Sequence, residues 1–297
     1  MKRALTALAL ITGLTGTALA ESVTINTALG EATIAANPDM TAVYDMGALD
    51  ILAALEVNGI ESVSNTYLDW LAAYSGDLGT LFEPDFEALN AASPDLIIAG
   101  GRSSTQVDAL ARIAPTIDMT MWGDNLLDQT RDRLTTYGII YGKESEAAKL
   151  ISELDAEIAE TRAAVQGKGT ALILLTNGGK ISAYGAGGRF GWLHTELGLP
   201  EVLEGMEDTE HGESVSFEFI REANPDWILV LDRVAAIGGE GENAQATLDN
   251  VLIAETKAAK NDQIIYLNAG DIYIAGGGIQ STLKTLELLK SAFGENS

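Results

Sequence analysis

The sequence of 297 residues contains no cysteine and only two histidines. The absence of cysteine excludes disulfides, thiolate metal sites and cysteine nucleophiles. Two histidines cannot form a histidine-rich site for zinc or manganese. Basic side chains are also few, since 18 Lys and Arg stand against 43 Asp and Glu. This balance excludes binding of nucleic acid or of an anionic membrane through the general field of the protein. Any anionic ligand must therefore meet positive charge that is concentrated locally.

Patterns typical of enzymes are missing as well. The sequence has no G-x-S-x-G elbow, no P-loop, no H-E-x-x-H pair and no D-x-D-x-D-G calcium loop. Two glycine-rich stretches, Gly185–Gly188 and Gly276–Gly278, lack the spacing of a dinucleotide-binding loop. We interpret them as turns that bring the backbone close to a ligand.

The first 20 residues have the layout of a secretory signal peptide. Two basic residues precede an apolar stretch from Ala4 to Leu14, and Ala18-Leu19-Ala20 is a small-x-small cleavage site. The apolar stretch is too short to span a bilayer, and no cysteine follows it for attachment of a lipid. We therefore predict a free periplasmic protein that starts near Glu21. Loss of the two basic residues leaves 16 basic and 43 acidic side chains, a net charge of −27.

An internal repeat indicates two similarly built lobes. Phe86-Glu87-Ala88-Leu89 is followed by Pro94-Asp95 and an apolar run. The same pattern returns 131 residues later, where Phe217-Glu218-Phe219-Ile220 is followed by Pro225-Asp226 and a second apolar run. Each copy predicts a short amphipathic helix, a Pro-Asp turn and a buried strand of the parallel-sheet type.

A long helix is predicted between the two copies. The stretch from Lys143 to Gln166 carries an apolar stripe at helical spacing and contains no breaker before Gly167, which predicts a helix of about 30 Å or more. We therefore predict an α/β protein with two Rossmann-like lobes, residues 21–141 and 168–297. The long helix within residues 142–167 joins them, and a ligand cleft lies between them.

Three of the eight arginines that follow the signal peptide lie where α/β proteins bind ligands. Arg102 and Arg233 each follow a predicted buried strand, and Arg189 follows Gly187-Gly188. Ligands of such proteins bind beyond the carboxyl ends of the strands, and guanidinium groups offer fixed planar donors to anionic oxygens. Either the three arginines form a positive pocket, or each pairs with a nearby carboxylate such as Asp232.

The two histidines lie in different settings. His194 belongs to a predicted helical segment, where we expect it to pack against its neighbours rather than to bind a ligand. His211 lies in a polar loop beside Gly212, where a side chain is freer to reach a ligand. By its position alone, His211 fits a plain loop residue equally well.

Together these segments resemble the ferric-siderophore periplasmic binding proteins of the helical-backbone type, in the branch that takes catecholate siderophores. The matching strings follow the family's order along nearly the whole exported chain; they are Val43–Asp50, Gly187–His194, His211–Ser214, Asn224–Arg233, Thr247–Asn250 and Asp271–Gly278. The resemblance implies a receptor with no catalytic activity and no intrinsic cofactor, which delivers a ferric siderophore to the permease dimer of an ABC importer. We expect a monomer that binds no nucleic acid.

The resemblance also implies which residues hold the ligand. In such proteins an arginine trio contacts catecholate oxygens, and Arg102, Arg189 and Arg233 occupy the matching positions. A His and a Tyr complete the coordination of Fe(III) when the siderophore is tetradentate, and His211 and Tyr273 match them. A hexadentate siderophore would leave Tyr273 lining the cleft without touching iron. The residue before Tyr273 is not the aromatic often found there, so the shape of the pocket can differ.

The resemblance gives the repeat a role as well. One surface glutamate on each lobe docks onto arginines of the permease in such proteins, and Glu87 and Glu218 occupy equivalent positions of the two copies. In so acidic a chain, both also fit ordinary glutamates on a helix surface.

Two other functions stay open. The same class of receptor can carry another cargo, namely a hydroxamate siderophore, haem or cobalamin. A neutral hydroxamate complex has little use for three guanidinium groups. A periplasmic metal-dependent hydrolase would need a ligand set or a nucleophile, and the sequence offers neither.

Overall fold

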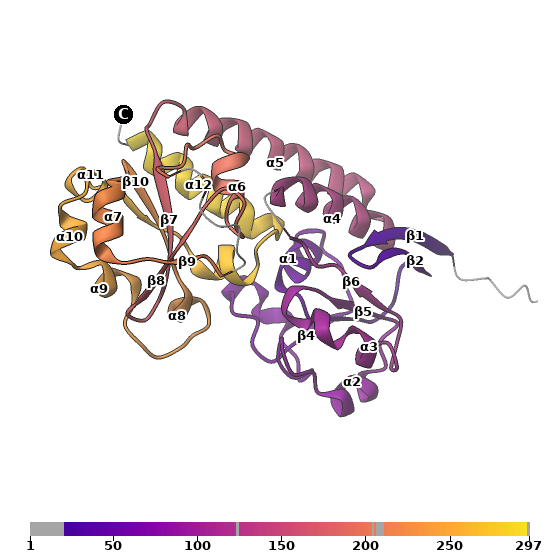
Figure 1. Ribbon diagram of the computed structural model, residues 1–297. Coiled ribbons are helices and arrows are strands. Elements are labelled where there is room, and N and C mark those ends of the chain that lie inside the picture. Colours follow the sequence, from indigo (N-terminus) through magenta and orange to yellow (C-terminus); the bar gives the residue numbers. More distant parts are fainter. Residues whose placement is uncertain (1–20, 123–124, 204, 206–210, 296–297) are drawn as a thin grey trace, which may run out of the picture.

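The computed structural model describes residues 21–122, 125–203, 205 and 211–295 (Figure 1). The predicted signal peptide lies outside these residues. The described chain opens with an antiparallel hairpin of β1 (Ser22–Thr27) and β2 (Gly30–Ala35).

The first lobe is built on a four-stranded parallel sheet in the order β4-β3-β5-β6. Its strands are short, and β3 and β5 are buried at every position, as expected for a sheet covered on both faces. The strands are β3 (Thr41–Val43), β4 (Ile60–Ser62), β5 (Leu96–Ala99) and β6 (Thr116–Asp118). The connections hold α1 (Met46–Ala54), η1 (Asp69–Tyr74), α2 (Phe86–Ala92), η2 (Gly101–Gln106) and α3 (Val107–Leu110).

The second lobe is built on a five-stranded mixed sheet in the order β11-β10-β7-β8-β9. Strands β7, β10 and β11 are parallel, whereas β8 and β9 run antiparallel to their neighbours. The strands are β7 (Ala171–Asn177), β8 (Lys180–Tyr184), β9 (Glu213–Ser214), β10 (Trp227–Asp232) and β11 (Ile264–Tyr266). The short helices are α6 (Trp192–Thr195), α7 (Phe217–Ala223), α8 (Arg233–Ala236), α9 (Ala244–Leu248), α10 (Val251–Ala254) and α11 (Lys257–Lys260).

Long helices connect the two lobes. After α4 (Leu126–Tyr141), the 22-residue α5 (Glu144–Val165) leads from the first lobe into β7; at 1.5 Å per residue it is about 33 Å long. The predicted α/β fold of two lobes joined by one long helix is thereby confirmed. A second helix also connects the lobes. Helix α12 (Ile279–Glu295) packs along α5, and it contacts α1 of the first lobe. Our proposed division at residues 142–167 assigns α12 to the second lobe, although it contacts both.

The repeat predicted from the sequence has the same structure in both copies. Helices α2 and α7 end at residues with left-handed backbone, Ser93 (φ 51°) and Asn224 (φ 48°), and a proline follows each. The aspartate of each Pro-Asp turn accepts a hydrogen bond from the residue before a neighbouring strand. Met40 N donates to Asp95 at 2.9 Å, and Thr170 N donates to Asp226 at 2.9 Å.

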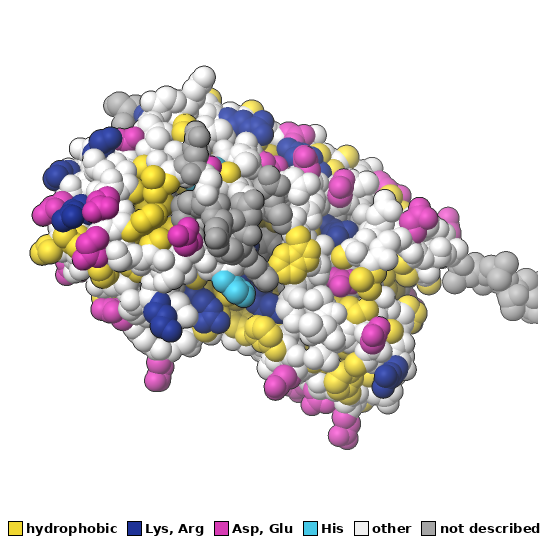
Figure 2. Space-filling model, in the orientation of Figure 1, with side chains coloured by type: hydrophobic (Ala, Val, Ile, Leu, Met, Phe, Trp, Pro, Cys, Tyr) yellow, Lys and Arg dark blue, Asp and Glu magenta, His cyan; other side chains and the backbone are white. Residues whose placement is uncertain are grey.

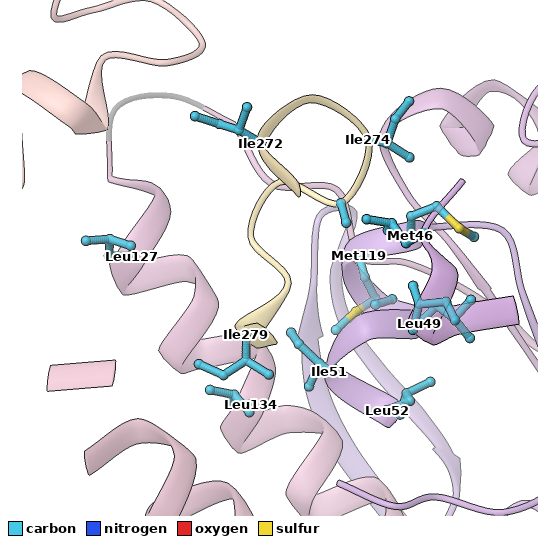
Figure 3. Close-up of a cluster of buried hydrophobic side chains, with 14 of the residues drawn as sticks. Met46, Leu49, Ile51, Leu52, Met119, Leu127, Leu134, Ile272, Ile274 and Ile279 are labelled. Atoms are coloured by element: carbon cyan, nitrogen blue, oxygen red, sulfur yellow. The ribbon is translucent and has the colours of Figure 1, made fainter. Parts of the chain in front are cut away.

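The segment between β11 and α12 is held on the first lobe by a buried cluster (Figure 3). Ile272 and Ile274, from the π-helical turn η3 (Gly270–Ile274), pack with apolar side chains of α1 and α4. The carboxylate of Asp50, which is fully buried in α1, accepts hydrogen bonds from Gln280 N at 2.7 Å and Ser281 N at 3.1 Å. It thus satisfies donors at the start of α12 that have no partner inside the helix.

Close packing also explains two glycines between η3 and α12. A Cβ on Gly278 would lie 2.7 Å from Asp50 Cβ, and one on Gly277, whose φ is +82°, would lie 2.1 Å from Met121 Cε. These two glycines let the backbone approach protein atoms, which corrects our interpretation that the whole stretch approaches a ligand. Only Gly276 of this stretch lines the cavity described next.

Candidate ligand-binding site

A cavity of about 500 Å³ lies between the two lobes, within the size range of small-molecule sites. Figure 2 shows basic side chains and a histidine gathered where the lobes meet, next to apolar side chains of the first lobe. The cavity lies beyond the carboxyl ends of the parallel strands, where ligands bind in open α/β sheets.

The three predicted arginines meet in this cavity. Arg102 is in η2 directly after β5, Arg233 is the first residue of α8 directly after β10, and Arg189 lies in the turn between β8 and α6. All three are partly buried. Parallel strands place their carboxyl ends at one edge of a sheet, so residues far apart in sequence come together.

The three guanidinium groups converge on Tyr273. Arg102 and Arg189 each donate from an Nη2 atom to the carbonyl oxygen of Tyr273 at 2.8 Å, and Arg233 Nε donates to its phenol oxygen at 3.1 Å. The Cζ atoms of Arg189, Arg102 and Arg233 lie 4.5, 5.0 and 6.0 Å from the centroid of its ring. The cavity therefore holds three positive charges around one aromatic ring.

The alternative in which each arginine pairs with a local carboxylate does not hold for the part of the chain described. No Asp or Glu there forms an ion pair with Arg102, Arg189 or Arg233. Asp232 instead accepts hydrogen bonds from the backbone N–H groups of Ala235 at 3.0 Å and Ala244 at 2.7 Å. The guanidinium groups are held by neutral oxygens, which leaves their charge available to an anionic ligand.

The charges shift the protonation of the groups around them. Burial raises the pKa of Tyr273, but the hydrogen bond from Arg233 and the charges of all three arginines outweigh it, so that the pKa falls below its ordinary value. The pKa of Arg189 is lowered by burial and by the like charge of Arg102. The lowered pKa of Tyr273 shows that the three arginines favour negative charge on its phenol oxygen.

The structure places the two histidines in different surroundings. His211 is exposed and lines the cavity together with Tyr273. His194 is buried in α6, its Nδ1 lies 2.9 Å from the carbonyl oxygen of Leu199, and burial lowers its pKa. The predicted packing role of His194 is confirmed. Whether His211 binds iron stays a prediction.

Asp45 lines the cavity and was not predicted from the sequence. It precedes α1, and its Oδ1 accepts a hydrogen bond from Ala48 N at 2.7 Å, as an N-cap does. Burial raises its pKa, and the hydrogen bond from Ala48 and the charges of Arg102 and Arg133 lower it by less. The cavity thus suppresses the charge of this carboxyl group. An Asp directly before a helix is explained by its role as an N-cap, so nothing in the sequence alone assigns it to a ligand.

An apolar wall on the first lobe was also missed. Its side chains follow β4 and β6 or begin α4; they are Phe82, Met119, Met121, Trp122 and Leu126. Strand β6 has only three residues, too few to recognise by alternation. The available signal was the position of Met119-Thr120-Met121-Trp122 at the carboxyl end of that strand.

The two glutamates of the repeat lie outside the cavity. Glu87 and Glu218 are both exposed, and each is the second residue of its helix, α2 or α7. Their equivalent placement follows from the equivalent structure of the two copies. No residue lining the cavity belongs to α2 or α7.

The described residues contain no group of three or more His, Asp or Glu side chains that could hold a metal ion. No helix among them is both long enough and apolar enough to cross a bilayer.

Comparisons with known proteins agree with this architecture. A family model described as periplasmic binding protein matches residues 41–269. The petrobactin-binding protein YclQ of Bacillus subtilis is 31% identical over 261 residues, which covers 86% of this chain and 82% of the relative. Its crystal structure matches with a TM-score of 0.85 and 29% identity, covering 92% of this chain and 99% of that one.

Two other relatives have a similar sequence identity to this chain. The ferric-anguibactin-binding protein FatB of Vibrio anguillarum is 30% identical over 263 residues, covering 85% of this chain and 82% of the relative. The crystal structure of the periplasmic catecholate-siderophore binding protein VctP of Vibrio cholerae matches with a TM-score of 0.84 and 32% identity, covering 91% of this chain and 100% of that one. These matches extend over both lobes and confirm the two-lobed fold.

Proposed function

Because the chain belongs to the periplasmic binding protein family, we propose that it is a receptor that captures a ferric siderophore with catecholate-type oxygens and delivers it to an ABC importer. The relatives above are named for petrobactin, ferric anguibactin and a catecholate siderophore. The predicted signal peptide supports a periplasmic location. The receptor acts by binding, without catalysis or a resident cofactor.

One observation carries the choice of cargo: three guanidinium groups meet around Tyr273 with no carboxylate partner among the described residues. A ferric catecholate complex carries negative charge on the oxygens that surround the metal. Charge-assisted hydrogen bonds from Arg102, Arg189 and Arg233 would replace their present bonds to neutral oxygens. A neutral ferric hydroxamate would leave the three charges uncompensated in a partly buried cavity, at a cost in affinity.

Tyr273 and His211 are our proposed protein ligands of the iron when the siderophore leaves coordination positions open. Phenolate oxygen is a hard anionic ligand suited to Fe(III), and imidazole suits iron as well. The lowered pKa of Tyr273 eases loss of the phenol proton on binding. Both side chains line the same cavity.

Glu87 and Glu218 are our proposed contacts with the permease. One exposed carboxylate on each lobe, at equivalent positions, offers a monomeric receptor a quasi-symmetric pair of charges. A two-fold permease dimer that presents basic side chains would match such a pair.

Fluorescence titration tests the proposal, since Trp122 and Trp192 line the cavity. Ferric complexes of catecholates should quench tryptophan emission in a saturable way, and a neutral ferric hydroxamate should quench it only at much higher concentration. Saturable quenching by the hydroxamate, haem or cobalamin, with none by any ferric catecholate, would contradict the proposed cargo.

A further inference from the structure

Two large aromatic side chains are exposed at the mouth of the cavity. Phe82 is 57% exposed and Trp122 is 55% exposed, and both line the cavity. The hydrogen bonds that hold the three arginines around Tyr273 involve neither of these side chains. Exposed apolar side chains that rim a pocket mark surfaces that a ligand or partner covers.

The topology of the first sheet sets where the two aromatics lie. In the order β4-β3-β5-β6, Phe82 belongs to the connection after β4 and Trp122 follows β6, the two outer strands. Asp45 and Arg102 follow the inner strands β3 and β5. Neighbouring strands are about 4.8 Å apart, so the outer strands lie roughly 14 Å from each other. The two aromatics therefore come from segments that follow opposite edges of the first sheet, and both line the cavity.

Local hydrogen bonds fix both aromatics in place. The side-chain amide of Gln129 accepts from Trp122 N at 3.1 Å and donates to Trp122 O at 2.6 Å. Thr80 Oγ1 accepts from Phe82 N at 3.3 Å and from Glu83 N at 3.0 Å, and Thr80 N donates to Glu83 O at 2.9 Å. Backbones held in this way present the rings to a ligand without a further loss of chain entropy on binding.

We propose that Phe82 and Trp122 form an aromatic clamp for the organic part of the siderophore. This inference rests on the proposed function and makes it more specific. The cavity has a lining of two kinds: Arg102, Arg189 and Arg233 meet around Tyr273, and apolar side chains come from both lobes, with the exposed Phe82 and Trp122 on the first. The ligand that fits both kinds of lining is a ferric complex with anionic oxygens in one part and an aryl or alkyl surface in another.

This chemistry separates ferric complexes by the surface that they present around their iron-binding groups. A compact complex with polar groups all around, such as one built from hydroxycarboxylates, satisfies the arginines but leaves the two aromatics exposed to water. Burial of an aromatic group against these rings contributes on the order of a tenfold gain in affinity. The clamp therefore sets the selectivity, and the arginines set the requirement for charge.

A matched pair of probes tests the clamp. Two tetradentate ligands with identical 2,3-dihydroxybenzoyl groups carry either a benzyl or a hydroxymethyl substituent on the linker, and calorimetry measures the affinity of each ferric complex. The wild type should prefer the benzyl complex about tenfold. Phe82→Ala and Trp122→Ala should each reduce this preference, and the double variant should abolish it, while affinity for the hydroxymethyl complex changes less than about twofold. Phe86→Ala, at an aromatic that is 40% exposed on α2 but does not line the cavity, should keep the preference.

Equal affinity of the wild type for both complexes would overturn the clamp, and so would a preference that persists in the folded double variant. Normal binding of both complexes by the double variant, with loss of siderophore uptake in cells, would assign the aromatics to permease contact and also overturn it. Failure of the wild type to bind either complex would contradict the proposed function itself. The clamp, which rests on that function, would then be rejected as well.

Discussion

We propose two alternative roles for Tyr273, and the denticity of the siderophore decides between them. Its phenol oxygen faces Arg233, and its flanking residues Ile272 and Ile274 are buried, so the ring is fixed in the cavity. A tetradentate complex leaves open positions that the phenolate can fill, whereas a hexadentate complex does not.

Substitution of Tyr273 by Phe should distinguish these cases. We expect the visible charge-transfer band of the protein-bound tetradentate ferric catecholate to shift in Tyr273→Phe, because a phenolate ligand is lost. The band of a hexadentate complex should stay unchanged. Tyr266→Phe, at a tyrosine outside the cavity, is the matched control. Identical spectra of wild type and Tyr273→Phe with the tetradentate complex would rule out ligation by this residue.

Asp50 links the stability of the protein to pH. Burial raises its pKa from 3.8 to about 6, while hydrogen bonds from Ser281 and Gln280 counteract part of the shift. Between these two values the folded protein retains a proton that the unfolded chain has released. The free energy of unfolding therefore falls as the pH rises through this range, by about 3 kcal/mol from this group.

The variant Asp50→Asn should show a weaker dependence on pH because an amide does not titrate. We expect the difference in free energy of unfolding, wild type minus variant, to be larger at pH 4 than at pH 7. Urea denaturation at both values measures it. Asp108→Asn, at an exposed residue of α3, should run parallel to the wild type. A wild-type advantage that grows from pH 4 to pH 7 would contradict the assignment.

At the residue scale, the sequence identified the groups that carry charge but not those that shape the cavity. Arginines after strands are rare in so acidic a chain, so Arg102, Arg189 and Arg233 stood out, and the structure brings them together. Met121 and Trp122 are apolar, and apolar residues in a sequence predict burial rather than a ligand wall. Their role depends on β6, whose three residues give no periodic signal.

At the scale of elements, the repeat and the long helix were the most predictable features. Both copies of the repeat form a helix, a Pro-Asp turn and a buried strand, because proline and left-handed residues end a helix wherever they occur. The packing of α12 on α1 was not predictable. It depends on the buried Asp50 and on close contacts at Gly277 and Gly278, which leave no pattern in the sequence.

The repeat leads to a prediction about uptake. Glu87→Lys and Glu218→Lys should each lower uptake of radiolabelled ferric catecholate by cells that lack the native receptor, and the double variant should lower it further, since like charges would face each other at the permease. Binding of the purified variants should equal that of the wild type because both residues lie outside the cavity.

Glu153→Lys provides the control for the change in net charge, since Glu153 is exposed on α5. Its uptake should match the wild type. Equal uptake by the Glu87→Lys, Glu218→Lys double variant would contradict the proposed docking role.

At the scale of the molecule, two helices limit the movement of the lobes. Helix α5 joins them covalently, and α12 packs along α5 while its first turn is held by Asp50 of the first lobe. Hinge motion needs a few residues that absorb large backbone changes, and packed helices resist such changes. We therefore expect only slight closure on binding.

The absence of cysteine makes this expectation easy to test. Spin labels on cysteines introduced at Asn90 of α2 and Glu222 of α7, both exposed, report the distance between the lobes by pulsed electron resonance. We predict one narrow distribution whose shift on addition of a ferric catecholate is smaller than its width. Two separate populations, or a shift beyond that width, would show a hinge that the helices do not prevent.

The net charge of the whole protein bears on how the arginine cluster could bind an anion. The whole sequence has a formal net charge of −25, which repels anions at long range, so an anionic ligand must gain its affinity from local contacts. Each charge-assisted hydrogen bond contributes about 1.5 to 3 kcal/mol. We propose that the three arginines of the cavity supply this interaction.

Calorimetric titration of the Arg189→Ala, Arg233→Ala double variant with a ferric catecholate tests this central claim most directly. We predict that each substitution weakens binding by roughly ten- to a hundredfold, while Arg112→Ala, at an exposed arginine outside the cavity, leaves the affinity unchanged. Binding of the folded double variant as tight as that of the wild type would contradict the account.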